Sequence, residues 1–438
     1  MSIAANQQRI VLQLLRQLSP HWRRDRNLPA RIQAMLARRR RFGARDRRLY
    51  REIIFTALRH LPWIEPVLRD NPDEAIRLLA WLAAETPATH DFRAAFALGP
   101  PPADDSSGLL PAWLRSHCPE IFTEAELAAQ RRRPPLWLRV QSGGRDAVTA
   151  ELSARGWDWR PSEVLTDALA VLSDADVTTT SAWADGFIEV QDLGAQTILA
   201  GIGLEPGEHW LDYCAGAGGK TLQLSRLLGP AGAVDAIDVR PAALTELRQR
   251  AQRARAPVFD PAATEAASFP PGHLRRPVSD RGFAPITILR TPPCGSYDGV
   301  LADVPCSGSG TWRRAPHLKW TTTETTIARA AERQRSLLAA AAGLVRPGGR
   351  LVYATCSISA RENEEVVDAF LADHPYFVPV PPSDRYGGIV RGAGRLLLPS
   401  MHDSDGYFVA ALLRQAASQR RSLTFQSDAG SLPPNPPE

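Results

Sequence analysis

Apolar residues recur every three or four positions through much of the first hundred residues. This spacing predicts amphipathic helices at 10–18, 49–61 and 76–82. A proline-rich and then polar stretch at 99–108 follows them and is typical of a linker. We therefore predict an all-α domain over residues 1–103.

Short apolar runs replace the helical spacing in the next hundred residues. They predict strands at 135–140, 168–172 and 186–190, with one short helix at 147–155. This pattern indicates a small α+β subdomain over residues 109–205.

From residue 206 onward, strand-like and helix-like segments alternate. The expected strands are 210–213, 233–237, 286–289, 297–303, 350–355 and 407–413, and the expected helices are 220–228, 241–253, 323–345 and 361–373. Such alternation is typical of a doubly wound parallel sheet. The last strand and a possible strand at 377–379 suggest one antiparallel edge. The predicted fold class is α/β, with a Rossmann-like sheet over 206–415.

Two segments do not follow these patterns. Residues 256–284 are rich in proline and have little apolar periodicity, and long loops of this kind are usually functional or disordered. Residues 416–438 are polar, with several prolines near the end, and we predict a disordered tail.

The positive charge of the chain is unevenly distributed. The net charge is +5 with a pI near 9.1, and residues 21–60 hold thirteen arginines against three acidic residues. Arg38, Arg39, Arg40 and Arg41 form the densest run. A solvated helix face is one interpretation, and a phosphate-binding surface is the other, because guanidinium groups match phosphate oxygens.

The five cysteines, at 118, 214, 294, 306 and 356, form neither a disulfide ladder nor a paired metal-binding motif. We therefore expect reduced thiols, a cytoplasmic protein and no metal. The N-terminus does not resemble a signal peptide, and the longest apolar stretch, 337–345, is too short to span a bilayer. No membrane partner is expected.

A glycine-rich turn at 212–221 follows the first strand of the α/β region, and three cofactor motifs compete for it. A phosphate-binding P-loop requires glycine where Cys214 stands. The dinucleotide motif requires glycine where Thr221 stands. Both motifs therefore fail by one residue.

The third motif is the acidic-x-G-x-G-x-G loop of S-adenosylmethionine (SAM)-dependent methyltransferases. Here Asp212, Gly216 and Gly218 fit, and only the first glycine is replaced, by Cys214. Asp238 ends the next strand, where an acidic residue holds ribose hydroxyls in related nucleotide folds. A turn without any ligand is the alternative, and the matched acid argues against it.

Two thiols follow apolar runs that predict buried strands. Cys306 comes after 300–302 and Asp303, and Cys356 comes after 351–354. Carboxyl ends of parallel strands share one edge, so both thiols and the glycine loop are expected in one cleft. Methylation at carbon 5 of cytosine requires a thiolate that first adds to carbon 6. A lone cysteine after a strand is often an inert apolar residue, but two cysteines at the strand ends of such a sheet indicate a catalytic role.

These residues resemble the Sun-family RNA (cytosine-5) methyltransferases, especially the bacterial enzymes that act on 16S rRNA. The resemblance is strong over 109–413, and its matching segments are 135–139, 186–192, 214–220, 303–310, 313–320 and 353–357. Residues 47–59 more weakly resemble the RNA-binding domain related to the antitermination factor NusB. The 109–205 unit resembles the family's RNA-recognition-like subdomain.

The resemblance implies a role for each matched residue. Cys356 would be the nucleophile, Cys306 would help to release the product, and Asp303 would lie near the target base. The implied SAM site comprises Cys214, Ala215, Gly216, Ala217, Gly218, Gly219, Lys220, Asp238 and Asp303. Lys319, the only lysine besides Lys220, would lie in a segment that faces RNA, together with the arginines 38–41.

The sequence departs from the family pattern at two places, and three questions stay open. The family usually has Ala-Pro where Gly216 and Ala217 stand, and it usually has an Asp after the third strand where Arg290 stands. Asp260 could supply that adenine contact if residues 258–259 form the strand. The substrate could be tRNA rather than the expected rRNA, or the chain could be a catalytically weak assembly factor. We expect a monomer.

Overall fold

The computed structural model describes residues 2–102, 106, 108–141, 143–260, 280–291, 293, 295–381 and 383–416. The predicted proline-rich loop lies mostly outside these residues, and so does nearly all of the predicted disordered tail. None of the helices in the described ranges is long and apolar enough to cross a membrane.

The first hundred residues form helices around one apolar core. The helices are α1 (Ile3–Leu18), α2 (Leu28–Arg38), α3 (Ala44–Arg59), α4 (Leu61–Asp70), α5 (Pro72–Leu82) and α6 (His90–Phe96). The residues that gave the helical spacing, such as Leu14, Ile53 and Leu79, are fully buried in it. The helices predicted at 10–18, 49–61 and 76–82 are confirmed, although each begins earlier in the structure and α3 ends at Arg59.

The next unit is a small antiparallel sheet beside short helices. Its strands are β1 (Leu136–Val140), β2 (Trp159–Pro161), β3 (Ala168–Val171) and β4 (Ile188–Val190), in the order β2-β3-β1-β4. Its helices are α7 (Glu124–Gln130), α8 (Arg145–Ala154), α9 (Ser181–Ala184) and α10 (Leu193–Ala200). The three predicted strands and the predicted helix (α8) are present, whereas β2, α7, α9 and α10 were not predicted.

The large sheet has ten strands within the described residues. They are β5 (His209–Asp212), β6 (Ala233–Ile237), β7 (Val258–Phe259), β8 (Ile286–Leu289), β9 (Tyr297–Asp303), β10 (Val345–Thr355), β11 (Phe377–Val380), β12 (Ile389–Arg391), β13 (Gly394–Leu397) and β14 (Tyr407–Arg414). The order is β12-β13-β14-β10-β9-β5-β6-β8-β7, and β11 also pairs with β14. Strands from β10 to β7 are parallel, whereas β11 to β14 pair antiparallel. The predicted α/β class with an antiparallel edge is confirmed.

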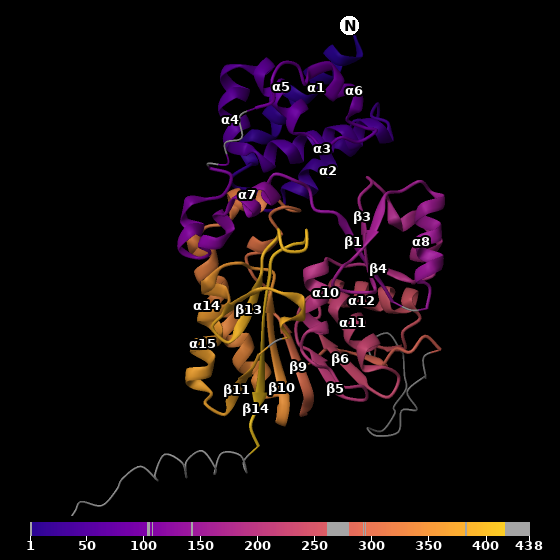
Figure 1. Cartoon of the computed structure of the whole chain (residues 1–438), viewed down its shortest axis with the longest axis vertical. Coiled ribbons are helices and arrows are strands. Elements are labelled where there is room, and N and C mark those ends of the chain that lie inside the picture. The colour runs from indigo at the N-terminus through magenta and orange to yellow at the C-terminus, as the bar shows by residue number, and fades with distance from the viewer. Residues whose placement is uncertain are drawn as a thin grey trace, which may run out of the picture.

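Helices cover both faces of this sheet (Figure 1). They are α11 (Gly219–Leu228) and α12 (Pro241–Ala254) with α10 on one side, α14 (Glu324–Ala342) and α15 (Glu364–Asp373) on the other, and the short α13 (His317–Thr321). Alternate strand residues face opposite layers: Leu301 packs with α11 and α12, whereas Val300 packs with α14. Burial on both faces explains why these strands are continuous apolar runs.

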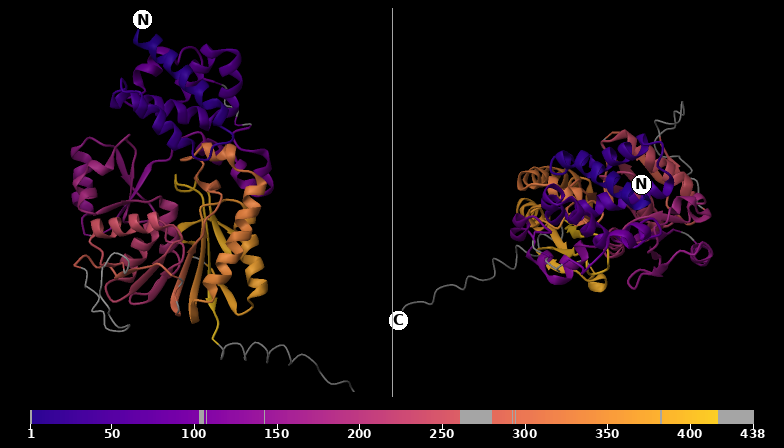
Figure 2. Two further views of the ribbon diagram at one scale, coloured as in Figure 1. Left: turned by 180° about the vertical axis from the view of Figure 1, so that it is seen from behind. Right: turned by 90° about the horizontal axis from the view of Figure 1, so that it is seen from above.

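The helical block covers the end of the sheet where the parallel strands finish. Strand β14 runs antiparallel to β10 and leaves the molecule at the end opposite to this block (Figures 1 and 2). The carboxyl ends of β5, β6, β9 and β10 therefore point toward it. Trp320 of α13 packs against the helical core and donates a hydrogen bond to the Leu58 carbonyl at 2.7 Å.

Candidate active site

A pocket of about 730 Å³ lies at the carboxyl ends of the parallel strands, where the sequence predicted a cleft. It brings together nearly all of the predicted cofactor and catalytic residues: Cys214, Ala215, Gly216, Ala217, Gly219, Lys220, Asp238, Asp303, Cys306 and Cys356. Gly218 is the exception, because it faces α12. A Cβ there would lie 2.5 Å from Leu247, so the loop can pack on α12 only with glycine.

The glycine loop joins β5 to α11 and curls around the end of β6. Gly216 and Gly218 have φ of +55° and +84°, a conformation that other residues rarely adopt. The Gly216 amide donates a hydrogen bond to Asp238 at 2.9 Å. The guanidinium of Arg240 also pairs with both oxygens of Asp238, at 2.9 and 3.0 Å. Although burial opposes it, these hydrogen bonds lower the pKa of Asp238, so the carboxylate is ionised and strongly bonded.

The small sheet holds this loop from outside. Arg139 of β1 donates a hydrogen bond to the Gly219 carbonyl at 3.1 Å. Glu189 of β4 pairs with Arg250, which donates to the Ala217 carbonyl at 3.0 Å. The segments 135–139 and 186–192, which carried part of the family resemblance, therefore position the loop.

The two thiols lie together in the pocket. The sulfur atoms of Cys306 and Cys356 are 3.3 Å apart, and both residues are partly exposed. The hydrogen bond to Cys356, together with burial, raises the pKa of Cys306 well above its usual value. Cys306 is therefore protonated at neutral pH, and its S–H is available to the Cys356 sulfur.

Lys220 supplies the positive charge beside the thiols. Its ammonium lies 2.7 Å from Asp303. Burial alone would lower the pKa of Lys220, but the charges of Asp303 and Cys356 raise it above its usual value. Lys220 is therefore a cation that lines the same pocket as Cys356.

A buried glutamate connects the two thiol loops. Glu362 accepts hydrogen bonds from the Ser307 amide at 2.8 Å and from the Ser357 hydroxyl at 2.7 Å. Its carboxylate also accepts the Ser307 hydroxyl and the Gln334 amide. Because Ser307 and Ser357 directly follow Cys306 and Cys356, this carboxylate fixes the two thiols relative to each other.

Several residues of the pocket and its support were not predicted. Gln191, Asp192, Arg240 and Tyr407 line the pocket, and Glu362 lies behind it. Gln191 and Asp192 fall in or beside a segment that resembled the family, so a signal was present for them. Glu362 had none, because its role depends on two loops that meet only in the folded chain.

The predicted RNA-facing position of Lys319 is wrong. Lys319 is buried on α13, and its amine donates to the carbonyls of Arg59 and Leu109 at 3.3 and 3.4 Å. Burial, with the nearby charge of Arg59, lowers the pKa of Lys319 to about 7. The lysine belongs to the junction between α13 and the helical block, whereas Arg38, Arg40 and Arg41 are exposed and Arg39 is half-buried.

The question of the adenine contact receives a partial answer. Residues 258–259 do form a strand, β7, and Asp260 follows it. Asp260 is buried, however, and its carboxylate pairs with Arg290 at 2.6 Å. Asp260 is not among the described residues that line the pocket. The pocket lining does include the apolar residues Ile237, Val239 and Leu337.

Comparisons with known proteins agree with this geometry. The family model for 16S rRNA methyltransferase RsmB/F matches residues 200–413. Ribosomal RNA small subunit methyltransferase B of Serratia proteamaculans is 31% identical over 318 residues, which is 71% of this chain and 68% of that protein. Its Klebsiella pneumoniae subsp. pneumoniae counterpart is 31% identical over 315 residues, 70% of this chain and 66% of that protein. The matched region thus spans about two thirds of these relatives.

The chain belongs to the RsmB/F methyltransferase family.

Solved structures support the fold of this family member. The crystal structure of PH0851 has a TM-score of 0.68 at 23% identity and covers 94% of this chain and 99% of its own. NSun6 from Pyrococcus horikoshii, solved with SFG, has a TM-score of 0.57 at 18% identity, covering 70% of this chain and 98% of its own. These likenesses establish the fold.

SAM is the cofactor of this family, and the pocket fits it. Asp212 is buried in the pocket wall, and its Oδ1 has no hydrogen-bond partner in the described structure, so it is available to a cationic group. Burial raises the pKa of Asp212 to about 7, an effect that a bound cation would reverse. The positive-φ glycines leave the backbone open to a ligand, and Asp238 offers a carboxylate for a diol.

We expect Asp238→Ala to weaken SAM binding at least tenfold, measured by isothermal titration calorimetry. A carboxylate hydrogen bond contributes about 1.5–3 kcal/mol, and this substitution also frees the Gly216 amide. Arg240→Ala is the matched variant: it removes a competitor for the same carboxylate and should tighten binding. Unchanged affinity in Asp238→Ala would place the cofactor elsewhere.

We expect Glu362→Gln to lower kcat for methyl transfer at least tenfold while leaving the KM for SAM unchanged. In the wild type, the Ser307 amide and the Ser357 hydroxyl donate to the two carboxylate oxygens of Glu362. Glutamine has only one acceptor oxygen, so one of the two cysteine loops loses its hydrogen bond. Steady-state kinetics with labelled SAM measures both constants. Glu365→Gln, at an exposed position of α15, is the control and should behave as wild type. A change in KM with constant kcat would contradict the positioning role.

Proposed function

We propose that this chain is a SAM-dependent RNA (cytosine-5) methyltransferase that acts on 16S rRNA through a covalent adduct of Cys356. The observation that carries the proposal is the 3.3 Å approach of two thiols inside the pocket that also contains the glycine loop. Direct methylation of a nitrogen or oxygen atom needs no cysteine, whereas carbon 5 of cytosine needs a nucleophile at carbon 6. The names of the relatives support rRNA as the substrate.

The reaction begins when the Cys356 thiolate forms a bond to carbon 6 of cytosine. Cys306 holds its proton because its pKa is raised, whereas Cys356 lies in the pocket together with the Lys220 cation, so Cys356 is the better candidate for the nucleophile. Asp303 lies at the end of β9 on the pocket wall, where it can bond the polar edge of the base. Carbon 5 becomes electron-rich as the carbon 6–sulfur bond forms.

SAM supplies the electrophilic methyl group that carbon 5 receives. The carbon 5 proton must then leave, and the carbon 6–sulfur bond must break to restore the double bond. Cys306 lies beside the leaving sulfur, to which it can give its proton. The resulting Cys306 thiolate can accept the carbon 5 proton. Cys356 then releases one proton to solvent, which returns the enzyme to its initial state. Because the reaction requires reduced thiols, we place the enzyme in the cytoplasm.

Transfer of labelled methyl groups to unmodified 16S rRNA, followed by mapping of the modified nucleotide, tests the proposal. We expect label at carbon 5 of one or a few cytosines, and none on tRNA. Label on a ring nitrogen or a ribose oxygen would overturn the cysteine mechanism. Label confined to tRNA would overturn the rRNA assignment and leave the mechanism intact.

A further inference from the structure

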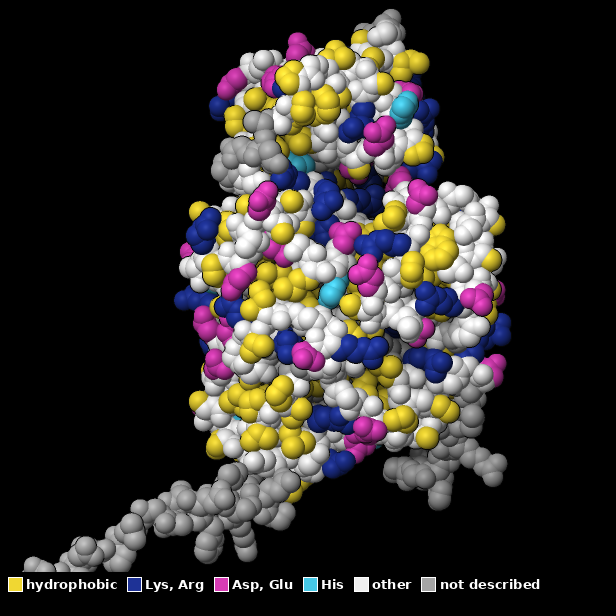
Figure 3. All heavy atoms as spheres, in the orientation of Figure 1, with side chains coloured by type: hydrophobic (Ala, Val, Ile, Leu, Met, Phe, Trp, Pro, Cys, Tyr) yellow, Lys and Arg dark blue, Asp and Glu magenta, His cyan; other side chains and the backbone are white. Residues whose placement is uncertain are grey.

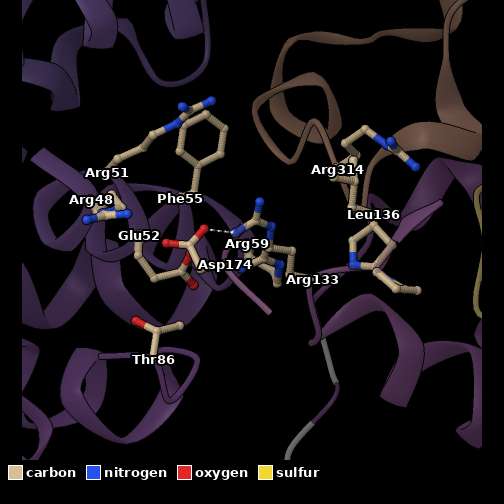
Figure 4. A pocket seen from close by; sticks show the side chains of 12 residues that line it. Arg48, Arg51, Glu52, Phe55, Arg59, Thr86, Arg133, Leu136, Asp174 and Arg314 are labelled. Atoms are coloured by element: carbon tan, nitrogen blue, oxygen red, sulfur yellow. Dashed lines mark hydrogen bonds and ion pairs between the residues drawn. The ribbon is translucent and has the colours of Figure 1, made fainter. Parts of the chain in front are cut away.

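A second hollow, of about 260 Å³, lies where the helical block meets the rest of the molecule. Arg48, Arg51 and Arg59 of α3 line it together with Arg133 and Arg314, and we call it the arginine cleft. Figure 4 shows the guanidinium groups arriving from both sides, and Figure 3 shows basic side chains gathered in the notch below the helical block. Glu52 and Asp174 are the acidic residues of its described lining.

Arg59 is a buried cation in this cleft that forms no ion pair with a carboxylate among the described residues, although the charge of nearby Glu52 acts on it. It is 4% exposed, its Nη2 donates to the Arg313 carbonyl at 3.3 Å, and its buried Nε has no hydrogen-bond acceptor. Burial lowers the pKa of Arg59 to about 10. Unpaired buried charge is costly, and an anion in the cleft would remove that cost.

The other cations of the cleft are not equally available. Arg314 pairs with Asp192 and Asp405, and Arg133 lies 3.4 Å from Asp174. Arg48 and Arg51 are exposed, and neither forms an ion pair within the described part of the chain. Arg51 lies over the ring of Phe55, which also lines the cleft. The free charge is therefore concentrated on α3, beside an aromatic ring.

The cleft is next to the active-site pocket. Arg314 lines the cleft, and its guanidinium lies 2.7 Å from Asp192, which lines the pocket. One ion pair thus separates the two hollows. If one unit of a polyanionic chain occupied the pocket, a neighbouring unit of the same chain would reach the arginine cleft.

We propose that the arginine cleft binds the phosphate backbone of the RNA strand that flanks the target cytosine. Arg48, Arg51 and Arg59 bond the phosphates, and Phe55 offers a surface on which a base can stack. This inference rests on the proposed function for the identity of the strand. It assigns the RNA contact to α3 and the domain junction rather than to the run Arg38–Arg41, none of which lines the cleft.

The test is the affinity for a 16S rRNA fragment, measured by filter binding across a range of salt concentrations. The double variant Arg48→Ala/Arg51→Ala should bind at least tenfold more weakly at physiological salt. Its salt slope should fall by roughly 0.7 for each single-strand phosphate contact that is lost. In methyl transfer the KM for RNA should rise while kcat at saturating RNA is kept. Arg59→Met, which keeps an unbranched side chain but removes the guanidinium, should also weaken binding, with folding checked by thermal unfolding.

Arg16→Ala/Arg47→Ala is the matched control, because it removes two exposed arginines of the same block that do not line the cleft. It should weaken RNA binding less than threefold. Equal losses in both double variants would overturn the proposal, and so would a larger loss in Arg40→Ala/Arg41→Ala. If polyglutamate displaced RNA as effectively as polyuridylate does, the claim that the cleft recognises nucleic acid would be overturned. Binding is measured without SAM, so the cleft can be supported even if methyl transfer to RNA fails.

Discussion

Replacing Cys356 by alanine should abolish methyl transfer to RNA, with a loss of at least about a thousandfold, equivalent to roughly 4 kcal/mol of transition-state stabilisation. The reason is chemical: without a sulfur at carbon 6, carbon 5 of cytosine is not nucleophilic enough to accept the methyl group. Cys306 is a poor replacement, because burial and the charge of Glu362, which remain in this variant, still raise its pKa. Transfer of labelled methyl groups to rRNA measures the loss.

The same variant should bind SAM and RNA normally, because neither the glycine loop nor the arginine cleft contains Cys356. Calorimetry and filter binding would show this. Cys118→Ala is the control for the loss of a thiol, since Cys118 lies buried away from the pocket and burial raises its pKa to about 12. Full activity in Cys356→Ala would contradict the covalent mechanism.

Much of the fold was predictable because its strands are buried on both faces. The predicted bounds of β6, β8 and β9 match the structure residue for residue, since each is a short, mainly apolar segment between turn residues. Strand β12, in contrast, is only three residues long and partly exposed, so its two apolar residues do not form a run that predicts a strand. The antiparallel edge that contains it forms because β14 offers a partner.

The pocket was predictable for a different reason. Residues that end parallel strands must share one edge of the sheet, so Asp303, Cys306 and Cys356 could be placed together from the chain alone. Lys220 followed from the glycine loop. Contacts between distant segments could not be placed in this way, and Glu362 is the clearest case, because its two serine partners belong to separate loops.

Lys319 and the arginines show the limit of arguments from charge. A lone lysine in a matching segment suggested an RNA contact, yet its amine bonds two carbonyls inside the junction. The densest arginine run, 38–41, does not line either hollow, whereas Arg59 and Arg133, distant in the sequence, meet in the cleft. Charge density along the chain does not show which cations the fold leaves without a partner.

Replacing Cys306 by alanine should instead trap the enzyme on its product. Cys356 remains free to attack, and Glu362 still holds its loop through Ser357, so the adduct forms and carbon 5 is methylated. Release then lacks the thiol that lies 3.3 Å from the leaving sulfur. We expect a covalent protein–RNA species that survives denaturing electrophoresis and carries the labelled methyl group, with turnover reduced at least a hundredfold.

Three controls identify the trapped species: the double variant, Cys356→Ala alone, and the replacement of SAM by S-adenosylhomocysteine. Cys306→Ala/Cys356→Ala should form no adduct, because the attacking sulfur is missing. S-adenosylhomocysteine in place of SAM should give little adduct with Cys306→Ala, because an unmethylated base can expel Cys356 without losing a carbon 5 proton. If the reverse pattern appeared, with an adduct in Cys356→Ala and none in Cys306→Ala, Cys306 would be the nucleophile. Burial, which remains in Cys356→Ala, still raises the pKa of Cys306 and argues against that assignment, since a sulfur that holds its proton attacks slowly.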